Sequence, residues 1–128
     1  MSYYFSKTLD ITFEEAIERA KEELKKEGFG VLTEIDVRQT LKKKLAVDFR
    51  NYRILGACNP PFAHKALQAE DKIGTMLPCN VIVQELDDGG VEVAAVDPLK
   101  SMQAIDNPSL AEVALQVQQK LQQVISRL

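Results

Sequence analysis

The feature that most constrains this chain is a short turn between two strand patterns. Residues 81–86 and 91–96 are rich in valine and other β-forming residues, and each run has the length of an ordinary strand. The four residues between them read Asp-Asp-Gly-Gly, and an Asp-Gly pair tolerates the positive φ angles of a tight hairpin turn. The sequence therefore predicts an antiparallel β-hairpin in the second half of the chain.

Two long amphipathic helices are predicted, one near each end of the chain. Thr12 and Glu15 have the spacing of a capping box, in which the threonine hydroxyl accepts from one free amide and Glu15 reaches back to another. Apolar residues follow at helical spacing as far as Gly28, which suits a helix C-terminus. The last helix is expected to begin at Asn107-Pro108, and its apolar stripe consists of Leu110, Val113, Ala114, Val117, Leu121, Val124, Ile125 and Leu128.

The remaining patterns complete an alternation of strands and helices. Strands are predicted over residues 3–8, 31–35 and 52–58, a short helix follows Asp36, and another helix begins at residues 59–61. The order is β-α-β-(α)-β-α-β-β-α. This order favours an α+β fold in which an antiparallel sheet is covered by amphipathic helices.

Length and composition exclude several classes of protein. The 128 residues are expected to form a single domain, 1–128. The net charge of −3 and the pI near 5.2 argue against a dedicated nucleic-acid-binding domain, which is usually basic. No run approaches the roughly 18 apolar residues that cross a membrane, and the N-terminal segment lacks the apolar core of a signal peptide. We expect a cytoplasmic protein with no nucleic-acid or membrane partner, whose fold needs no disulfide.

Four segments resemble a known protein family. They are Gly28–Asp36 (GFGVLTEID), Tyr52–Pro60 (YRILGACNP), Leu77–Val81 (LPCNV) and Val96–Pro98 (VDP). Together they are similar to the bacterial and archaeal family called domain of unknown function 302, and the resemblance spans nearly the whole chain. It implies a small α+β domain with an antiparallel sheet that assembles as a homodimer. The family has no established activity, so the resemblance leaves the function open.

The most specific local feature is a repeated Cys-Asn pair, at Cys58-Asn59 and at Cys79-Asn80. Cys58 ends a predicted strand directly before a helix, where free amides and the helix dipole can lower a thiol pKa. His64, the only histidine, lies on that helix. Cys58, Cys79 and His64 could together hold a soft ion such as Zn²⁺ or Cu(I), or the two thiols could form a redox pair. Alternatively, both cysteines simply pack in the core.

The arrangement of the strands decides whether the two pairs meet. In an antiparallel meander, the end of the third strand and the start of the fourth lie at the same end of the sheet. In a parallel crossover they lie about 20 Å apart. We expect the two Cys-Asn pairs to converge and to form the most site-like spot on the surface. Asn59 and Asn80 then offer amide donors beside the sulfur atoms, unless they act only as cap or turn residues.

Basic residues gather between positions 38 and 53. Six lysines and arginines stand there against Asp48 alone, so this segment carries a charge of +5 and the rest of the chain carries −8. If Arg53 and Tyr52 face a pocket, the segment could bind an anion or a phosphate. Alternatively, its lysines form a solvated helix face, because three successive lysines cannot point the same way on a helix.

The motifs of common enzyme classes are not found. Gly28-x-Gly30 stands between a helix and a strand, which is the reverse of the order in a dinucleotide fingerprint. The sequence has neither a Walker A motif nor a nucleophile elbow. Glu34, Asp36 and Asp97 could serve as metal-binding or acid–base carboxylates, but Asp36 fits a helix cap and Asp97 fits a turn that ends a strand. The sequence therefore names no catalytic residue and leaves open whether the protein is an enzyme.

The sequence favours a homodimeric, non-enzymatic binding module for a small ligand, an anion or a soft metal. The alternatives are a thiol-based redox protein or enzyme that uses Cys58 or Cys79, and a protein-interaction domain without a small-molecule site. The apolar stripe of the last helix and the aromatic first strand would supply a subunit contact. No cofactor is identified. The candidate ligand-binding residues are Cys58, Asn59, Cys79, Asn80, His64 and Arg53, and the candidate metal ligands are Cys58, Cys79 and His64.

Overall fold

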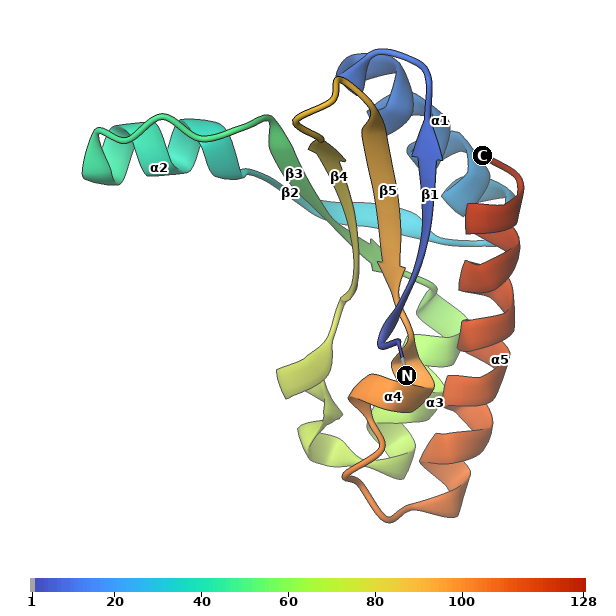
Figure 1. Ribbon diagram of the computed structural model, residues 1–128. Coiled ribbons are helices and arrows are strands. Elements are labelled where there is room, and N and C mark those ends of the chain that lie inside the picture. Colours follow the sequence, from blue (N-terminus) through green and yellow to red (C-terminus); the bar gives the residue numbers. More distant parts are fainter. Residues whose placement is uncertain (1) are drawn as a thin grey trace.

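The computed structural model describes residues 2–128, which form one five-stranded sheet and a set of helices (Figure 1). The fold class is α+β, as the sequence predicts. The elements in chain order are β1 (Tyr4–Leu9), α1 (Phe13–Lys26), β2 (Gly30–Asp36), α2 (Val37–Leu45), β3 (Tyr52–Cys58), α3 (Pro60–Ala69), the 3₁₀ helix η1 (Asp71–Met76), β4 (Cys79–Glu85), β5 (Val91–Val96), α4 (Pro98–Ser101) and α5 (Pro108–Ser126).

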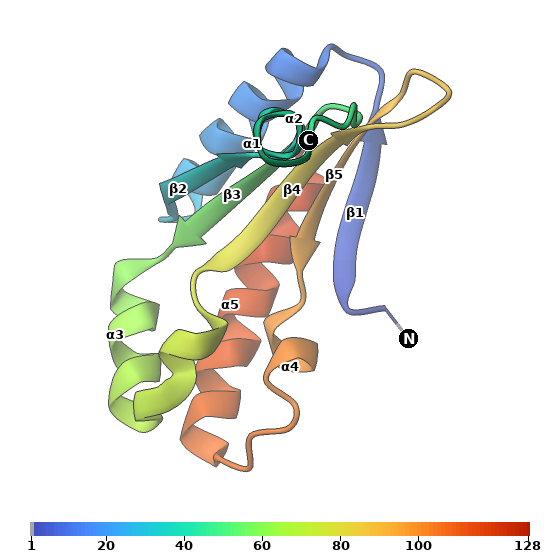
Figure 2. The same cartoon turned by 90° about the vertical axis from the view of Figure 1, so that its left-hand side faces the viewer.

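The sheet has the strand order β1-β5-β4-β3-β2, and every neighbouring pair is antiparallel. Strands β2 to β5 form a meander, and the hairpin predicted at Asp-Asp-Gly-Gly joins β4 to β5. Helices α1 and α5 cover one face of the sheet, whereas the other face is open (Figures 1 and 2). Helix α2 stands away from the sheet on its open side (Figure 1).

The first helix begins with a modified form of the predicted cap. The Thr12 hydroxyl accepts a hydrogen bond from the Glu15 amide at 3.1 Å, which satisfies one free donor of the helix end. The Glu15 carboxylate accepts from that same hydroxyl at 3.1 Å instead of reaching a second backbone amide. At the other end, Gly28 has a φ of +87°, the left-handed conformation of a helix C-terminus, so the predicted end of the helix is confirmed.

The core lies between the covered face of the sheet and helices α1 and α5. Successive inward positions of the strands supply fully buried residues, among them Leu55, Val81 and Val93. Leu24 of α1 and Leu121 of α5 face them and are equally buried. Each such side chain stabilises the fold by about 1.5–3 kcal/mol through its removal from water. In residues 2–128, no helix is both long enough and apolar enough to span a membrane.

Two short helices were not predicted. Helix α4 begins directly after β5, because the Asp97 carboxylate accepts from the Leu99 amide at 3.0 Å and Pro98 fits the first turn. The 3₁₀ helix η1 occupies part of a segment that the sequence marks only as a loop. Strand β4 also begins two residues earlier than expected, at Cys79. These additions build a second packed region, in which α3 lies against η1 and α5 beyond the ends of β3 and β4 (Figure 2).

Candidate ligand-binding pocket

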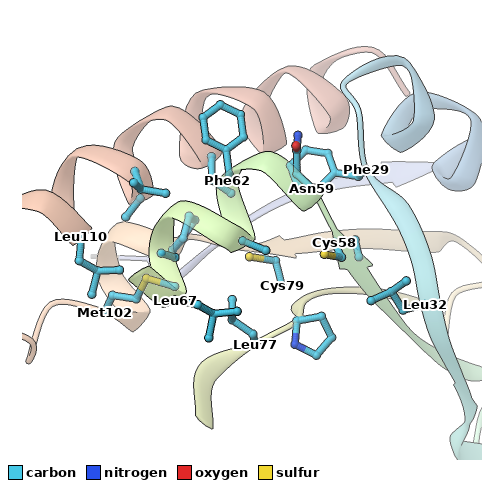
Figure 3. A pocket seen from close by; sticks show the side chains of 18 residues that line it. Phe29, Leu32, Cys58, Asn59, Phe62, Leu67, Leu77, Cys79, Met102 and Leu110 are labelled. Carbon is cyan, nitrogen blue, oxygen red and sulfur yellow. The ribbon is translucent and has the colours of Figure 1, made fainter. Parts of the chain in front are cut away.

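Antiparallel pairing brings the two cysteines to one end of the sheet. Ala57 of β3 lies opposite Cys79 of β4, so Cys58 and Cys79 lie on neighbouring strands at adjacent positions. Of the two arrangements that the sequence leaves open, a meander and a parallel crossover, the structure has the meander. Both side chains reach a pocket between these strand ends and the helices α3 and α5 (Figure 3).

The pocket has a volume of about 310 Å³ and an almost entirely apolar lining. Its walls come from the strand ends, from α3, from the segment before β4, and from α4 and α5. The 18 lining residues are Phe29, Leu32, Ala57, Cys58, Asn59, Phe62, Ala63, Ala66, Leu67, Leu77, Pro78, Cys79, Pro98, Met102, Leu110, Val113, Ala114 and Val117. No charged side chain is among them, so a ligand in this pocket meets hydrocarbon, sulfur and the amide of Asn59.

A β-bulge in β2 supplies one edge of the pocket. Val31 pairs with Ala57 and Thr33 pairs with Gly56, so Leu32 is an extra residue in β2. Leu32 is 68% exposed and Leu67 of α3 is 44% exposed, although both line the pocket. Bulges re-aim side chains at the edges of sheets, which accounts for the position of Leu32. These two leucines border the opening, and neither was predicted to belong to the site.

Gly56 permits a close approach of three segments beside the pocket. A Cβ atom at this position would lie 2.1 Å from Thr33 Oγ1 and 2.8 Å from Pro78 Cγ. Neither distance leaves room for a side chain, so the glycine lets Thr33 of β2 and Pro78 before β4 approach β3 this closely. Since Pro78 lines the pocket, Gly56 helps to set the position of its wall.

The two thiols differ in burial and in acidity. Cys79 is buried, and its burial, followed by the neighbouring Cys58, raises the pKa of its thiol to about 11. Cys58 is half-buried, and both cysteines are free. Thiolate is the form that attacks electrophiles and binds soft metals, and the raised pKa keeps the Cys79 thiol as a neutral S–H at neutral pH.

Asn59 begins α3 without capping it. Its side-chain Nδ2 donates to the Glu27 carbonyl at 3.1 Å, and no side-chain cap hydrogen bond is made. The buried amide therefore joins the end of β3 to the C-terminal turn of α1. One of its donors is satisfied within the protein, so Asn59 acts first as a structural link of the pocket wall.

Asn80 and His64, both candidate ligand-binding residues, lie outside the pocket, so only Cys58, Asn59 and Cys79 of the two Cys-Asn pairs converge there. Asn80 follows Cys79 in a strand, so its exposed side chain points to the open face of the sheet. His64 follows Ala63 in α3 and is turned toward solvent, because Ala63, Ala66 and Leu67 face the pocket. No group of three or more His, Cys, Asp or Glu residues within 2–128 is placed to hold a metal ion, so the Cys58–Cys79–His64 set is not assembled.

Arg53 lies at the opposite end of β3 and forms ion pairs within the protein. Its guanidinium contacts Glu34 at 2.7 Å and Asp36 at 3.4 Å, and it lies 5.8 Å from the centre of the Phe13 ring. Arg53, followed by Lys21, holds the pKa of the Glu34 carboxyl below its usual range in spite of partial burial. The Arg53 guanidinium is thus paired with two carboxylates of β2, at a distance from the pocket.

The remaining acidic candidates act as caps. Asp36 accepts from the Gln39 amide at 2.9 Å at the start of α2, and Asp97 caps α4 while it also accepts from Gln118 Nε2 at 3.1 Å. Both positions agree with the cap and turn interpretations of the sequence. These carboxylates are held by the ends of helices and do not converge on the pocket.

Comparison with known proteins places the chain among uncharacterised relatives. The family model described as "Domain of unknown function DUF302" matches residues 5–128. The chain is similar to a solved structure described as "uncharacterized conserved protein DUF302 from Bacillus stearothermophilus", with 30% sequence identity and a TM-score of 0.92. That match covers 99% of this chain and 98% of the other. A search of curated proteins found no match.

Proposed function

Since this chain belongs to the DUF302 family, whose description assigns no function, we propose from the chemistry of its pocket that it binds a small, uncharged, apolar ligand. In this proposal the protein is a non-enzymatic binding domain. The observation that carries the proposal is the lining of the 310 Å³ pocket, in which 18 residues offer no charge.

The apolar lining favours an uncharged ligand over an anion or a metal. An ion that enters the pocket loses its hydration shell, and no lining side chain compensates for this loss with an opposite charge. A soft metal would require thiolates, whereas the pKa of Cys79 is raised to about 11. The same fact weighs against the alternative of a redox pair formed by Cys58 and Cys79.

The dimensions of the pocket set the size of the ligand. At about 30 Å³ for each water-sized group, 310 Å³ holds about ten non-hydrogen atoms. Phe29, Phe62 and Met102 supply aromatic rings and a polarisable sulfur, which suit either a short alkyl chain or a single aromatic ring. A polar end group of the ligand would remain in water at the opening, between Leu32 and Leu67.

Titration with linear alcohols from propanol to octanol, followed by NMR shifts of the protein, tests this proposal. Each added CH₂ group is expected to tighten binding about fourfold until the pocket is full. Hexanoate and hexylammonium, with the charge in place of the hydroxyl, are expected to bind no more tightly than hexanol. Shift changes are expected at residues that line the pocket.

A variant that fills the pocket gives a second test, and the same substitution at an exposed position is its control. Ala63→Leu adds bulk inside the pocket and is expected to weaken hexanol binding at least about tenfold. Ala111→Leu makes the same change at an exposed position of α5 and is expected to leave binding unchanged. Equal binding by both variants, or affinity that does not grow with chain length, contradicts the proposal.

A further inference from the structure

The ligand pocket adjoins an edge of the sheet that no strand covers. Strand β2 is last in the order of the sheet, and within residues 2–128 it pairs only with β3. Every second residue of such an edge strand directs its N–H and C=O groups away from the sheet. Phe29, just before β2, and Leu32, within it, line the pocket, whereas no residue of the other edge strand, β1, does so. Free backbone groups and an apolar pocket therefore occur together at β2.

The free edge of β2 is accessible to another molecule. Five of its seven residues are exposed, and in Figure 2 β2 and α3 follow the same border of the molecule. Lysine and proline, which often protect edge strands from pairing, are absent from the β2 sequence GVLTEID. Its bulge is another device that limits pairing between edges, but this bulge also brings Leu32 to the opening of the pocket. An extended segment can therefore approach β2 beside that opening.

Gly30 leaves a path from this edge to the pocket. It pairs with Cys58, which lines the pocket (Figure 3). A Cβ atom at residue 30 would meet nothing within 4 Å, so the space beside the glycine is open. A residue of an added strand that pairs with Gly30 would point to the same face as Gly30 and Cys58. Its side chain would then lie across the glycine toward the opening beside Leu32.

The dimensions of this path fit an aromatic or long aliphatic side chain. Neighbouring strands lie about 4.8 Å apart, so an added strand would lie about 10 Å from β3. Aromatic and long side chains contact neighbours about 7–8 Å away across a sheet, which is enough to pass Gly30 and reach Leu32. The pocket holds about ten non-hydrogen atoms, more than a phenylalanine side chain contains.

The charges at this edge favour an uncharged segment. The two acidic residues of β2, Glu34 and Asp36, both form ion pairs with Arg53. Glu34 also contacts Lys21 at 3.0 Å. Because these carboxylates are already paired and no charged side chain lines the pocket, a charged segment would lose hydration there without gaining a counter-charge.

We propose that the ligand of this pocket is an apolar side chain of an extended, uncharged peptide segment, which pairs with β2 as a sixth strand of the sheet. This inference rests on the proposed function and names the class of its ligand. Main-chain hydrogen bonds to β2 would supply affinity that does not depend on sequence, and the pocket would select the apolar side chain. A peptide satisfies both the free backbone groups of the edge and the apolar lining, whereas an alcohol meets only the lining.

Titration with capped pentapeptides, followed by NMR shifts of the protein, tests this inference. The probe is acetyl-Thr-Thr-Phe-Thr-Thr-amide, and its matched control has alanine in place of phenylalanine. We expect the phenylalanine peptide to bind at least about tenfold more tightly and to shift the amide resonances of β2 together with those of the pocket. The same peptide with all main-chain nitrogens methylated keeps the side chain but donates no hydrogen bond. It is expected to bind at least about fivefold more weakly.

A variant of the protein separates the path from the pocket itself. Gly30→Leu fills the open space beside residue 30 and leaves every lining residue of the pocket in place. It is expected to weaken binding of the phenylalanine peptide at least about tenfold and to leave hexanol binding unchanged, which also shows that the variant is folded. Thr8→Leu introduces the same side chain at an exposed position of the other edge strand, β1, and is expected to bind the peptide like the wild type.

Two results would overturn the inference and leave the proposed function intact. The first is hexanol binding without preference for the phenylalanine peptide over the alanine peptide, which would restrict the pocket to free small molecules. The second is binding of the phenylalanine peptide that neither methylation nor Gly30→Leu weakens, which would place the side chain in the pocket without a strand at β2. Absence of hexanol binding by the wild type would instead contradict the proposed function itself.

Discussion

At the scale of single residues, Cys79 has the most altered chemistry in the pocket. Its position opposite Ala57 buries the sulfur against the covered face of the sheet, and the neutral thiol is the form that this position favours. Cys58, one position away on the next strand, is half-buried and borders the space that a ligand would fill. Both cysteines of the doubled Cys-Asn pattern thus belong to the wall of the pocket.

The raised pKa of Cys79 predicts a loss of stability in alkaline solution. In the unfolded chain this thiol ionises near pH 9, whereas in the folded protein it remains neutral until about pH 11. The neutral thiol therefore contributes its full share of the free energy of unfolding below pH 9. This share, about 3 kcal/mol in total, is lost as the pH rises toward 11. We expect urea denaturation from pH 8 to 10.5 to show a steeper decline for the wild type than for Cys79→Ala.

Cys58→Ala is the control for this measurement. It removes a half-buried thiol next to the same pocket and is expected to keep the steep decline of the wild type. Lysine and tyrosine residues also titrate in this range, so the comparison rests on the difference between variants. Parallel curves for the wild type and Cys79→Ala would show that the buried thiol does not resist ionisation.

Two candidate residues, Asn80 and His64, lie outside the pocket for reasons that periodicity explains. Asn80 follows Cys79 in a strand, where successive side chains point to opposite faces. His64 follows Ala63 in a helix, where successive side chains differ in direction by about 100°. Neighbouring positions in the sequence therefore need not share a site, because strand and helix geometry turns their side chains in different directions. Leu32 has no sequence signal of its own, because a bulge depends on how two strands pair.

At the scale of elements, substitution of Gly56 tests how much the packing of β2, β3 and the start of β4 contributes to stability. Gly56→Ala would place a methyl group 2.1 Å from Thr33 Oγ1, and the Thr33 hydroxyl and Pro78 must move to admit it. We expect a loss of about 1–3 kcal/mol of unfolding free energy, measured by urea denaturation. The movement of Pro78 is also expected to weaken alcohol binding.

Gly30→Ala is the matched control in the neighbouring strand. A Cβ atom at residue 30 meets nothing within 4 Å, so this variant is expected to lie within about 0.5 kcal/mol of the wild type. If both glycine variants cost the same, the close contact at Gly56 does not limit stability.

Most elements could be predicted because their signals are local. The strands 52–58 and 91–96 agree with β3 and β5, and Thr12, Asp36 and Asn107 begin helices through the side-chain bonds that their types suggest. Helix α4 has a local start signal in Asp97 and Pro98, but from the sequence Asp97 is interpreted as a turn residue that ends a strand. The 3₁₀ helix η1 begins without a side-chain cap, so its segment offers no comparable local signal.

At the scale of the whole molecule, the packed core predicts that stability does not depend on a covalent link. Both cysteines are free, and one continuous cluster of buried residues connects the strands with α1 and α5. We expect the thermal midpoints with and without an excess of reductant to agree within about 1 °C, because a chain of this length forms a core that needs no covalent link. A drop of several degrees, measured by circular dichroism, would reveal a stabilising disulfide formed during purification.

The position of β1 beside β5 has a consequence for the order in which the chain folds during synthesis. Strands β3 to β5 each pair with the preceding strand, so each can pair soon after it leaves the ribosome. Phe5 of β1 pairs with Ala95, so the first strand waits until almost the whole chain has been made. During that interval Tyr4 and Phe5 have no strand beside them, and transiently exposed apolar side chains of this kind are prone to association. Pairing of β1 with β5 therefore completes the sheet and ends this interval.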